Sequence, residues 1–170
     1  MLKSILAATV VAAVFSSSSI SAQTPEAEAA ENRIVTSVSM ADIKTITAGY
    51  GHTVIEEMPE KNGIVLEAQN GFKYLVILKV CEQADACQGV LIGSLHDVPE
   101  GTTWEMLNAA DMRMDAFGLY ISEEQLIVDR YMILSGGVRV ANFRHEIGSL
   151  MAGAPPLVRS IGQLAAAAEG

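Results

Sequence analysis

The stretch FKYLVILKVCEQADACQGVLIGSLHDV, residues 72–98, contains two apolar runs separated by a short polar loop. Runs of this length, bounded by turn residues, favour two neighbouring strands of an antiparallel hairpin. The middle of the first run is apolar at consecutive positions, which is typical of a strand that is covered on both faces. We therefore predict a central strand at residues 72–81 and its partner strand at residues 89–98.

Both cysteines of the chain, Cys81 and Cys87, flank the loop between these two strands. Such a pair can act as a redox switch, hold a metal ion or staple the structure. The C-x5-C spacing differs from the C-x-x-C motif of thioredoxin-like sites, and no other His or Cys lies at a spacing suited to zinc. Opposite residues on antiparallel strands have Cα atoms about 4.5–5.5 Å apart. We therefore predict a structural Cys81–Cys87 disulfide.

The first 22 residues, MLKSILAATVVAAVFSSSSISA, have the three parts of a secretory signal peptide. Lys3 precedes an apolar run, and small residues follow up to Ala22. The run is shorter than the roughly 20 residues of a stable membrane-spanning helix, although a permanent N-terminal anchor is an alternative. We predict cleavage near Gln23 and a periplasmic or secreted protein without stable membrane insertion, in which two close cysteines oxidise to each other.

The charge balance limits the partners of the protein. The chain has 20 acidic and 11 basic residues, with a formal net charge of −9. An acidic surface repels phosphate backbones and anionic lipid headgroups. We therefore expect neither nucleic acid nor a membrane surface as a partner. Aromatic residues make up only 5% of the chain, so the core must consist mainly of Ile, Leu, Val and Met.

We divide the exported chain into a linker and a single domain. Residues 23–33 are rich in Ala and Glu and have almost no apolar anchor, which is typical of a disordered linker. Residues 34–165 are long enough to form one hydrophobic core. Their pattern predicts a helix, strands, a helix, strands and a last helix, in that order. The predicted class is α+β, with a mainly antiparallel, twisted sheet and helices packed on it.

Capping signals place the first two helices. Ser39 and Asp42 predict a capping box for a helix that ends at Gly49, and Thr102 and Glu105 predict a second one. The second helix has one apolar stripe, formed by Trp104, Leu107, Ala110 and Met114. The eight methionines of the chain include three on this helix. We expect them to fill the core, with a Met-rich binding surface as the alternative.

The C-terminal part predicts two more helices. Residues 138–153 form an amphipathic pattern, and Gly153 with Pro155 and Pro156 is expected to end it. Residues 157–168 then form a last short helix. The apolar face of the longer helix contains Val140, Phe143, Ile147, Leu150 and Met151.

No set of residues in the sequence predicts catalysis, cofactor binding or a metal site. The histidines His52, His96 and His145 are scattered over different predicted elements, so we interpret them as ordinary surface or half-buried residues. The Ser-Gly-Gly turn at residues 135–137 precedes a helix but lacks the Lys-Ser/Thr of a P-loop. We therefore predict a tight turn there, and we predict that the protein is not an enzyme.

Residues 103–150, TWEMLNAADMRMDAFGLYISEEQLIVDRYMILSGGVRVANFRHEIGSL, resemble the C-terminal half of YbjN-family domains. The resemblance rests on a helix with Leu107-Asn108, a strand pair with Asp129 and Tyr131, the LSGGV segment and an amphipathic helix. Upstream, the two-cysteine segment and TAGYGHTVIEE, residues 47–57, are similar to exported members. The resemblance covers about residues 34–161. This chain departs from the family pattern at two positions, Asp111 and Arg139.

The resemblance implies a fold similar to type III secretion chaperones, which are often dimeric. YbjN domains are described as bacterial sensory transduction regulators, so it also implies a binding or regulatory role without catalytic residues to transfer. We therefore expect an exported domain that binds a protein or peptide, with a homodimer as an open possibility. The alternative is a carrier of a small apolar ligand in a pocket between the sheet and the Met-rich helix. A hydrolase of unrecognised type is a third reading.

The apolar strand at residues 72–81 also predicts where a partner binds. Its side chains point alternately to the two faces of the sheet, and the first predicted helix, with Ile43 and Ile46, is short for covering the second face. We therefore expect the face around Leu75 and Ile77 to be covered either by a mobile terminal helix or by a partner chain.

Overall fold

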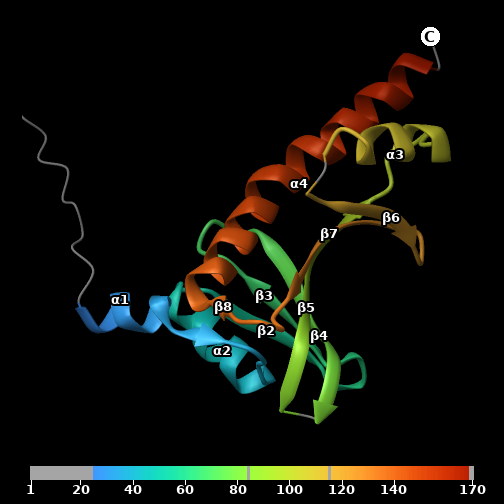
Figure 1. The fold of residues 1–170 in the computed structure, drawn as a ribbon. Coiled ribbons are helices and arrows are strands. Elements are labelled where there is room, and N and C mark those ends of the chain that lie inside the picture. The colour runs from blue at the N-terminus through green and yellow to red at the C-terminus, as the bar shows by residue number, and fades with distance from the viewer. Residues whose placement is uncertain (1–24, 84, 115, 169–170) are drawn as a thin grey trace, which may run out of the picture.

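The computed structural model describes residues 25–168, apart from positions 84 and 115. Its centre is a six-stranded antiparallel sheet with the strand order β2-β3-β4-β5-β7-β6 (Figure 1). The strands are β2 (Thr53–Met58), β3 (Gly63–Glu67), β4 (Lys73–Gln83), β5 (Ala86–Asp97), β6 (Gly118–Ser122) and β7 (Gln125–Ile133). This arrangement confirms the predicted α+β class and its antiparallel sheet. The predicted signal peptide, residues 1–22, lies outside the described residues.

Strands β4 and β5 form the central hairpin that the sequence predicts. They pair along most of their length, with a bulge near the hairpin end, and their side chains alternate between the two faces. On β4, Tyr74, Val76 and Leu78 belong to the hydrophobic core. Leu75 and Ile77 point to the opposite face. The strand is thus apolar on both sides, as predicted, but only one of these sides faces the core.

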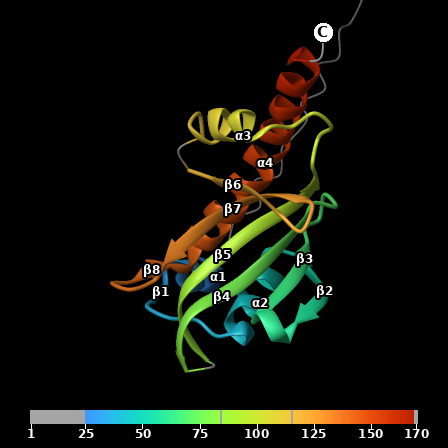
Figure 2. The ribbon, with the colours of Figure 1, turned by 90° about the vertical axis from the view of Figure 1, so that its right-hand side faces the viewer.

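Three helices cover one face of the sheet: α2 (Met40–Gly49), α3 (Trp104–Asp111) and α4 (Val140–Ala168). Their buried side chains form one cluster with the side chains of the strands that point toward them. In Figure 2, β4 and β5 lie in front of α2 and α4. Within the described residues, the opposite face of the sheet is therefore left without a covering helix.

Helix α2 begins as the sequence predicts. Ser39 is the N-cap, its backbone N–H donates to Asp42 Oδ2 at 2.9 Å, and Asp42 N donates to Ser39 Oγ at 3.1 Å. The hydrogen bonds from Ser39 hold the pKa of Asp42 below its usual value. Ile43 and Ile46 turn inward and are buried. The helix ends at Gly49, and Tyr50 follows as its C-cap.

Helix α4 runs without interruption from Val140 to Ala168, so the predicted stop at Pro155 and Pro156 is wrong. Each proline removes a backbone N–H donor, which is costly inside a helix. The apolar stripe nevertheless continues beyond the prolines, where Leu157 and Ile161 are buried. This half of α4 packs against α3, where Pro156, Leu157 and Ser160 lie beside Ala110. Burial of the continued stripe stabilises the helix and offsets the missing hydrogen bonds.

The segment that we predicted to be a disordered linker, residues 23–33, is largely helical, because α1 spans Pro25–Asn32. Ala and Glu are good helix formers, and Glu31 Oε1 lies 2.6 Å from Arg144 Nη2 on α4. Contact with α4 therefore stabilises a helix that has few apolar residues of its own. The remaining short elements are β1 (Ile34–Val35), its partner β8 (Val138–Arg139) and the 3-10 turn η1 (Pro59–Lys61).

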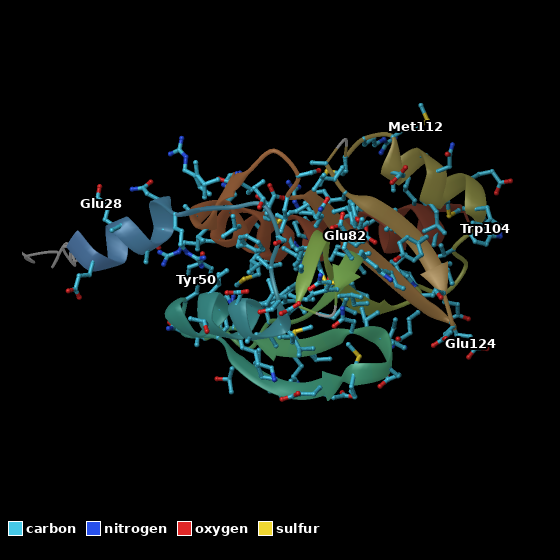
Figure 3. The ribbon with its side chains drawn as sticks, turned by 60° about the horizontal axis from the view of Figure 1, so that its bottom comes forward. Glu28, Tyr50, Glu82, Trp104, Met112 and Glu124 are labelled. Carbon is cyan, nitrogen blue, oxygen red and sulfur yellow. A yellow bond between two sulfur atoms is a disulfide. The ribbon has the colours of Figure 1, made fainter. Side chains whose placement is uncertain are left out.

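Helix α3 begins one residue later than the predicted capping box. Thr103 is the N-cap and accepts a hydrogen bond from Met106 N, whereas the hydroxyl of Thr102 donates to Pro99 O. As the first residue of the helix, Trp104 is 69% exposed and does not belong to the buried stripe; Figure 3 shows it on the outside of the molecule. The other members of the predicted stripe are buried or partly buried: Leu107, Ala110 and Met114.

Candidate functional site

The uncovered side of the sheet, which we call the open face, carries mostly apolar side chains. It is formed by Leu75, Ile77, Leu91, Leu95, Tyr120, Ile127, Asp129 and Tyr131. Most of these residues line a groove of about 220 Å³. Leu75 is only 9% exposed, whereas Leu95 and Tyr131 are 45% and 48% exposed. The fold thus buries one apolar face of its sheet and leaves a second one accessible.

A carboxylate lies in the middle of this apolar face. Asp129 on β7 has Gly93 and Gly118 as its cross-strand neighbours, and Tyr120 Oη donates a hydrogen bond to Asp129 Oδ2 at 3.0 Å. Burial raises the pKa of Asp129 above its ordinary value. Burial, helped by the carboxylate, raises the pKa of Tyr120 to about 12. The charge of Asp129 is therefore already partly removed from water.

Glycines make the space that the polar side chains of the open face occupy. A Cβ atom at Gly118 would collide with the carboxylate of Asp129, and one at Gly89 would collide with the hydroxyl of Tyr131. An isolated glycine inside a strand pattern is a signal for such a close approach. This signal is present in the sequence, but only the structure shows which side chains use the space.

An acidic turn borders the groove. Glu123 and Glu124 form the two-residue loop between β6 and β7, with φ values of 50° and 63°. Turns of this kind favour Asn and Gly, because other residues are strained at positive φ. Glu123 lines the groove together with Lys61 and Lys79, and Figure 3 shows Glu124 at the tip of the hairpin. Two negative charges are thus held in a costly conformation beside the open face.

The predicted disulfide joins Cys81 and Cys87 at the end of the central hairpin, with their Cα atoms 3.9 Å apart. Asn62 Nδ2 lies 3.3 Å from Cys81 Sγ as a donor. Cys87 is fully buried, and its backbone pairs with Val38 in the segment that leads to α2. The bridge therefore fastens the hairpin where the N-terminal segment joins the sheet, which is the place expected for a structural staple.

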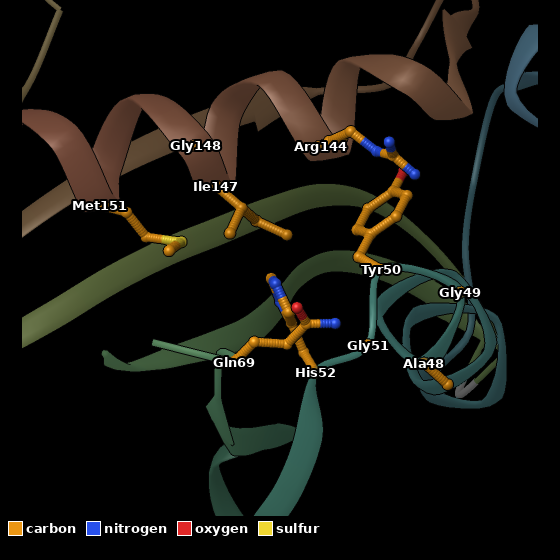
Figure 4. A pocket seen from close by; sticks show the side chains of 10 residues that line it. All are labelled: Ala48, Gly49, Tyr50, Gly51, His52, Gln69, Arg144, Ile147, Gly148 and Met151. Atoms are coloured by element: carbon orange, nitrogen blue, oxygen red, sulfur yellow. The ribbon is translucent and has the colours of Figure 1, made fainter. Parts of the chain in front are cut away.

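A recess of about 490 Å³ lies between the C-terminal end of α2 and helix α4 (Figure 4). His52 points into it, and His52 Nδ1 lies 2.7 Å from Tyr74 Oη. The guanidinium carbon of Arg144 lies 4.4 Å from the ring centroid of Tyr50. Burial lowers the pKa of His52, and the positive charge of Arg144 lowers it further. Because Gly148 of α4 forms part of the wall, we call this recess the Gly148 cavity.

The structure keeps the three histidines apart. His52 faces the Gly148 cavity, His96 Nε2 lies 2.9 Å from Ser94 Oγ on the same strand, and His145 is exposed on α4. The Ser-Gly-Gly stretch at residues 135–137 is a turn whose glycines have positive φ values. Among the residues that the structure describes, no three His, Cys, Asp or Glu side chains form a metal-binding group.

The three residues Asp129, Arg130 and Tyr131 are divided between the two faces of the sheet, as their alternation predicts. Arg130 points to the helices, where it forms an ion pair with Glu146 of α4 and donates to Ala116 O at 2.9 Å. The sequence pattern therefore predicts that Asp129 and Tyr131 lie on the same face of the sheet. It does not show that this face is uncovered, nor that a cavity forms beside α4.

No family model matches this chain, and no curated protein is significantly similar to it. Within the described part of the chain, no helix combines the length and the hydropathy needed to cross a bilayer.

Proposed function

We propose that this chain is an exported, non-enzymatic binding domain of the YbjN family that holds a segment of a protein partner on its open face. The observation that carries the proposal is the accessible apolar groove with the half-buried carboxylate of Asp129 beside it. Reversible binding of this kind suits a regulator, which is the role that the family resemblance implies.

The apolar character of the groove supports a protein or peptide as the ligand. Contiguous apolar patches on soluble proteins mark interaction sites. Burial of apolar surface contributes roughly 25 cal/mol per Å². A partner that covers Leu91, Leu95 and Tyr131 therefore gains binding free energy from surface that is otherwise in contact with water.

The half-buried carboxylate of Asp129 favours a basic side chain on the partner. A partner that fills the groove removes more water from Asp129, and a buried carboxylate is costly unless it is paired. Glu123 and Glu124 add negative charge next to the groove, whereas Lys61 and Lys79 in its wall add positive charge, so the preference for a basic side chain comes from Asp129. We therefore expect the bound segment to present a Lys or Arg, flanked by apolar residues, to Asp129.

The disulfide supports the export part of the proposal, because such bridges persist in oxidising compartments. The carrier alternative receives less support. The recess that contains Met114, between α3 and α4, has a volume of about 230 Å³, whereas pockets for small molecules usually measure about 300–1,000 Å³.

Peptide selection tests the proposal. Displayed random peptides are selected on the purified protein, and the affinity of the selected peptides is measured by fluorescence anisotropy. We expect peptides with a basic residue between apolar residues. The double variant Leu95→Ser/Tyr131→Ser should weaken their binding at least about tenfold, which corresponds to about 1.4 kcal/mol. Asp129→Asn should weaken basic peptides more than matched peptides in which the basic residue is replaced by Gln.

The matched control is Trp104→Ser/Met112→Ser, which removes two apolar side chains at the ends of α3 that are 69% and 75% exposed and do not line the groove. It should leave peptide affinity unchanged. Equal binding of the selected peptides to the open-face variant would contradict the proposal. If light scattering shows a dimer that Leu95→Ser/Tyr131→Ser dissociates, then a second copy of the chain occupies the face and the protein-partner proposal fails.

A further inference from the structure

The Gly148 cavity is separate from the open face, because it lies on the helix side of the sheet (Figure 4). Its volume of about 490 Å³ is within the range of small-molecule sites. The wall combines polar groups with apolar ones: Tyr50, His52, Gln69, Arg144, Ile147 and Met151. A mixed lining with a few convergent polar groups is the usual composition of a ligand site.

Helix α4 contains three glycines, and at Gly148 no neighbouring group requires the side chain to be absent. A Cβ atom at Gly153 would collide with the ring of Phe117, and one at Gly162 would lie 3.7 Å from Pro99. At Gly148, by contrast, a Cβ atom would meet no described atom within 4 Å. Glycine inside a helix is destabilising relative to alanine. Each of these glycines lowers helix stability, but only Gly148, which is exposed, lies in the wall of the cavity, where the absent side chain leaves space.

The polar groups of the wall favour an anion. Arg144 pairs with Glu31 through Nη2, and a guanidinium has further N–H donors in a planar fork that matches a carboxylate. Glu31 itself is not part of the cavity wall. Gln69 lies across Gly51 at the other side of the opening, and its amide supplies additional donors. Met151 of α4 supplies apolar surface in the wall, whereas Ile147 is 2% exposed and contributes little.

We propose that the Gly148 cavity binds a small carboxylate with an apolar body. The carboxylate contacts the guanidinium of Arg144 and the amide of Gln69, and His52 offers a further hydrogen bond from its free ring nitrogen. The apolar body packs on Met151, next to the open space at Gly148. This site is independent of the open face, so either proposal can fail without the other.

Phenylacetate and its neutral analogue phenylacetamide are suitable probes. Each is titrated into the ¹⁵N-labelled, disulfide-bonded protein while backbone amide shifts are followed by NMR. We expect phenylacetate to shift the amides of His52 and Gly148 and to bind at least tenfold more tightly than phenylacetamide. Arg144→Gln should remove this preference for the charged probe. Gly148→Leu should abolish the binding of both probes, because the new side chain fills the cavity.

Ala152→Leu is the control, since it adds the same side chain at an exposed position of α4 outside the cavity wall. It should leave the affinities unchanged. Thermal unfolding of Gly148→Leu should occur at the same or a higher temperature than in the unmodified protein, because leucine is the better helix former. Failure of phenylacetate to shift these amides up to its solubility limit would overturn the site. Equal affinity for both probes would overturn the proposed preference for a carboxylate. Retained binding in Gly148→Leu would show that the probes bind outside the Gly148 cavity.

Discussion

At the scale of single residues, Asp129 is a charged side chain in a mostly apolar environment. It is a carboxylate on an apolar sheet face, and Tyr120 supplies its hydrogen-bond donor. Glycines on both neighbouring strands give it space. A charge in such a place weakens the isolated fold, which is an expected property of residues that serve binding rather than stability.

The pH dependence of stability should reveal this cost. The folded pKa of Asp129 lies above its unfolded value of about 3.9, so folding is favoured by this group at low pH and the contribution is lost as the pH rises through the folded pKa. We predict that Asp129→Asn raises the free energy of unfolding at pH 7 by less than about 1 kcal/mol, since the group is only half-buried. Urea unfolding should show no such gain at a pH below the unfolded pKa.

Glu56→Gln serves as the comparison, because Glu56 is an exposed carboxylate on β2. It should change stability little at either pH. If Asp129→Asn raised the free energy of unfolding equally at neutral and acidic pH, then the charge of the Asp129 carboxylate would not be the cause of the lower stability.

At the scale of elements, the β6–β7 hairpin is joined by a turn that its residues do not favour. Both Glu123 and Glu124 have positive φ values, where Asn and Gly are preferred. The two like charges also repel each other. The turn is therefore a place where stability is lost next to the groove that we propose as the binding site.

Replacing the turn should separate stability from binding. We predict that Glu123→Asn/Glu124→Gly raises the free energy of unfolding by about 1 kcal/mol, because both new residues adopt positive φ with less strain. The same variant should weaken the basic peptides selected on the open face, since two charges near the groove are gone. Urea unfolding and fluorescence anisotropy measure the two effects. An unchanged free energy of unfolding would show that the turn is not strained. An unchanged peptide affinity would show that the charges of the turn do not attract the partner.

Helix α4 shows a second conflict between local and tertiary effects. Pro155 and Pro156 oppose a helix locally, yet the apolar stripe continues to Ile161 and packs on α3. The helix therefore extends beyond the sheet together with α3 (Figure 1). The predicted alternative, a terminal helix that folds over Leu75 and Ile77, is not what the described residues show.

At the scale of the whole molecule, the domain has one core and one apolar face outside it. Ile161 is fully buried although it lies beyond the prolines, so we predict that Ile161→Ala lowers the free energy of unfolding by about 2–5 kcal/mol. Leu95→Ala on the open face should cost less than about 1 kcal/mol, because Leu95 is 45% exposed. Urea unfolding of both variants checks this difference. Similar costs at both positions would mean that the open face is covered in solution.

Several elements could be predicted because their signals are local. The Ser39 capping box depends on residues three positions apart, and the central hairpin follows from two apolar runs around Cys81 and Cys87. The opposite faces of Asp129 and Arg130 follow from strand alternation alone. The prediction that Trp104 belongs to the buried stripe is wrong, because a helical stripe does not show that the first residue of a helix lies outside the core.

The sequence by itself determined the α+β class, the antiparallel order of the hairpins, the disulfide and the start of α2, because each of these depends on neighbouring residues or on short-range periodicity. The tertiary structure alone decided the continuity of α4 through its prolines, the ordering of α1 by Arg144, the uncovered open face and the Gly148 cavity. These features depend on contacts between segments that are far apart in the chain, such as Glu31 with Arg144. The burial of apolar side chains at such contacts outweighs local conformational preferences. A local sequence pattern does not show where these contacts form.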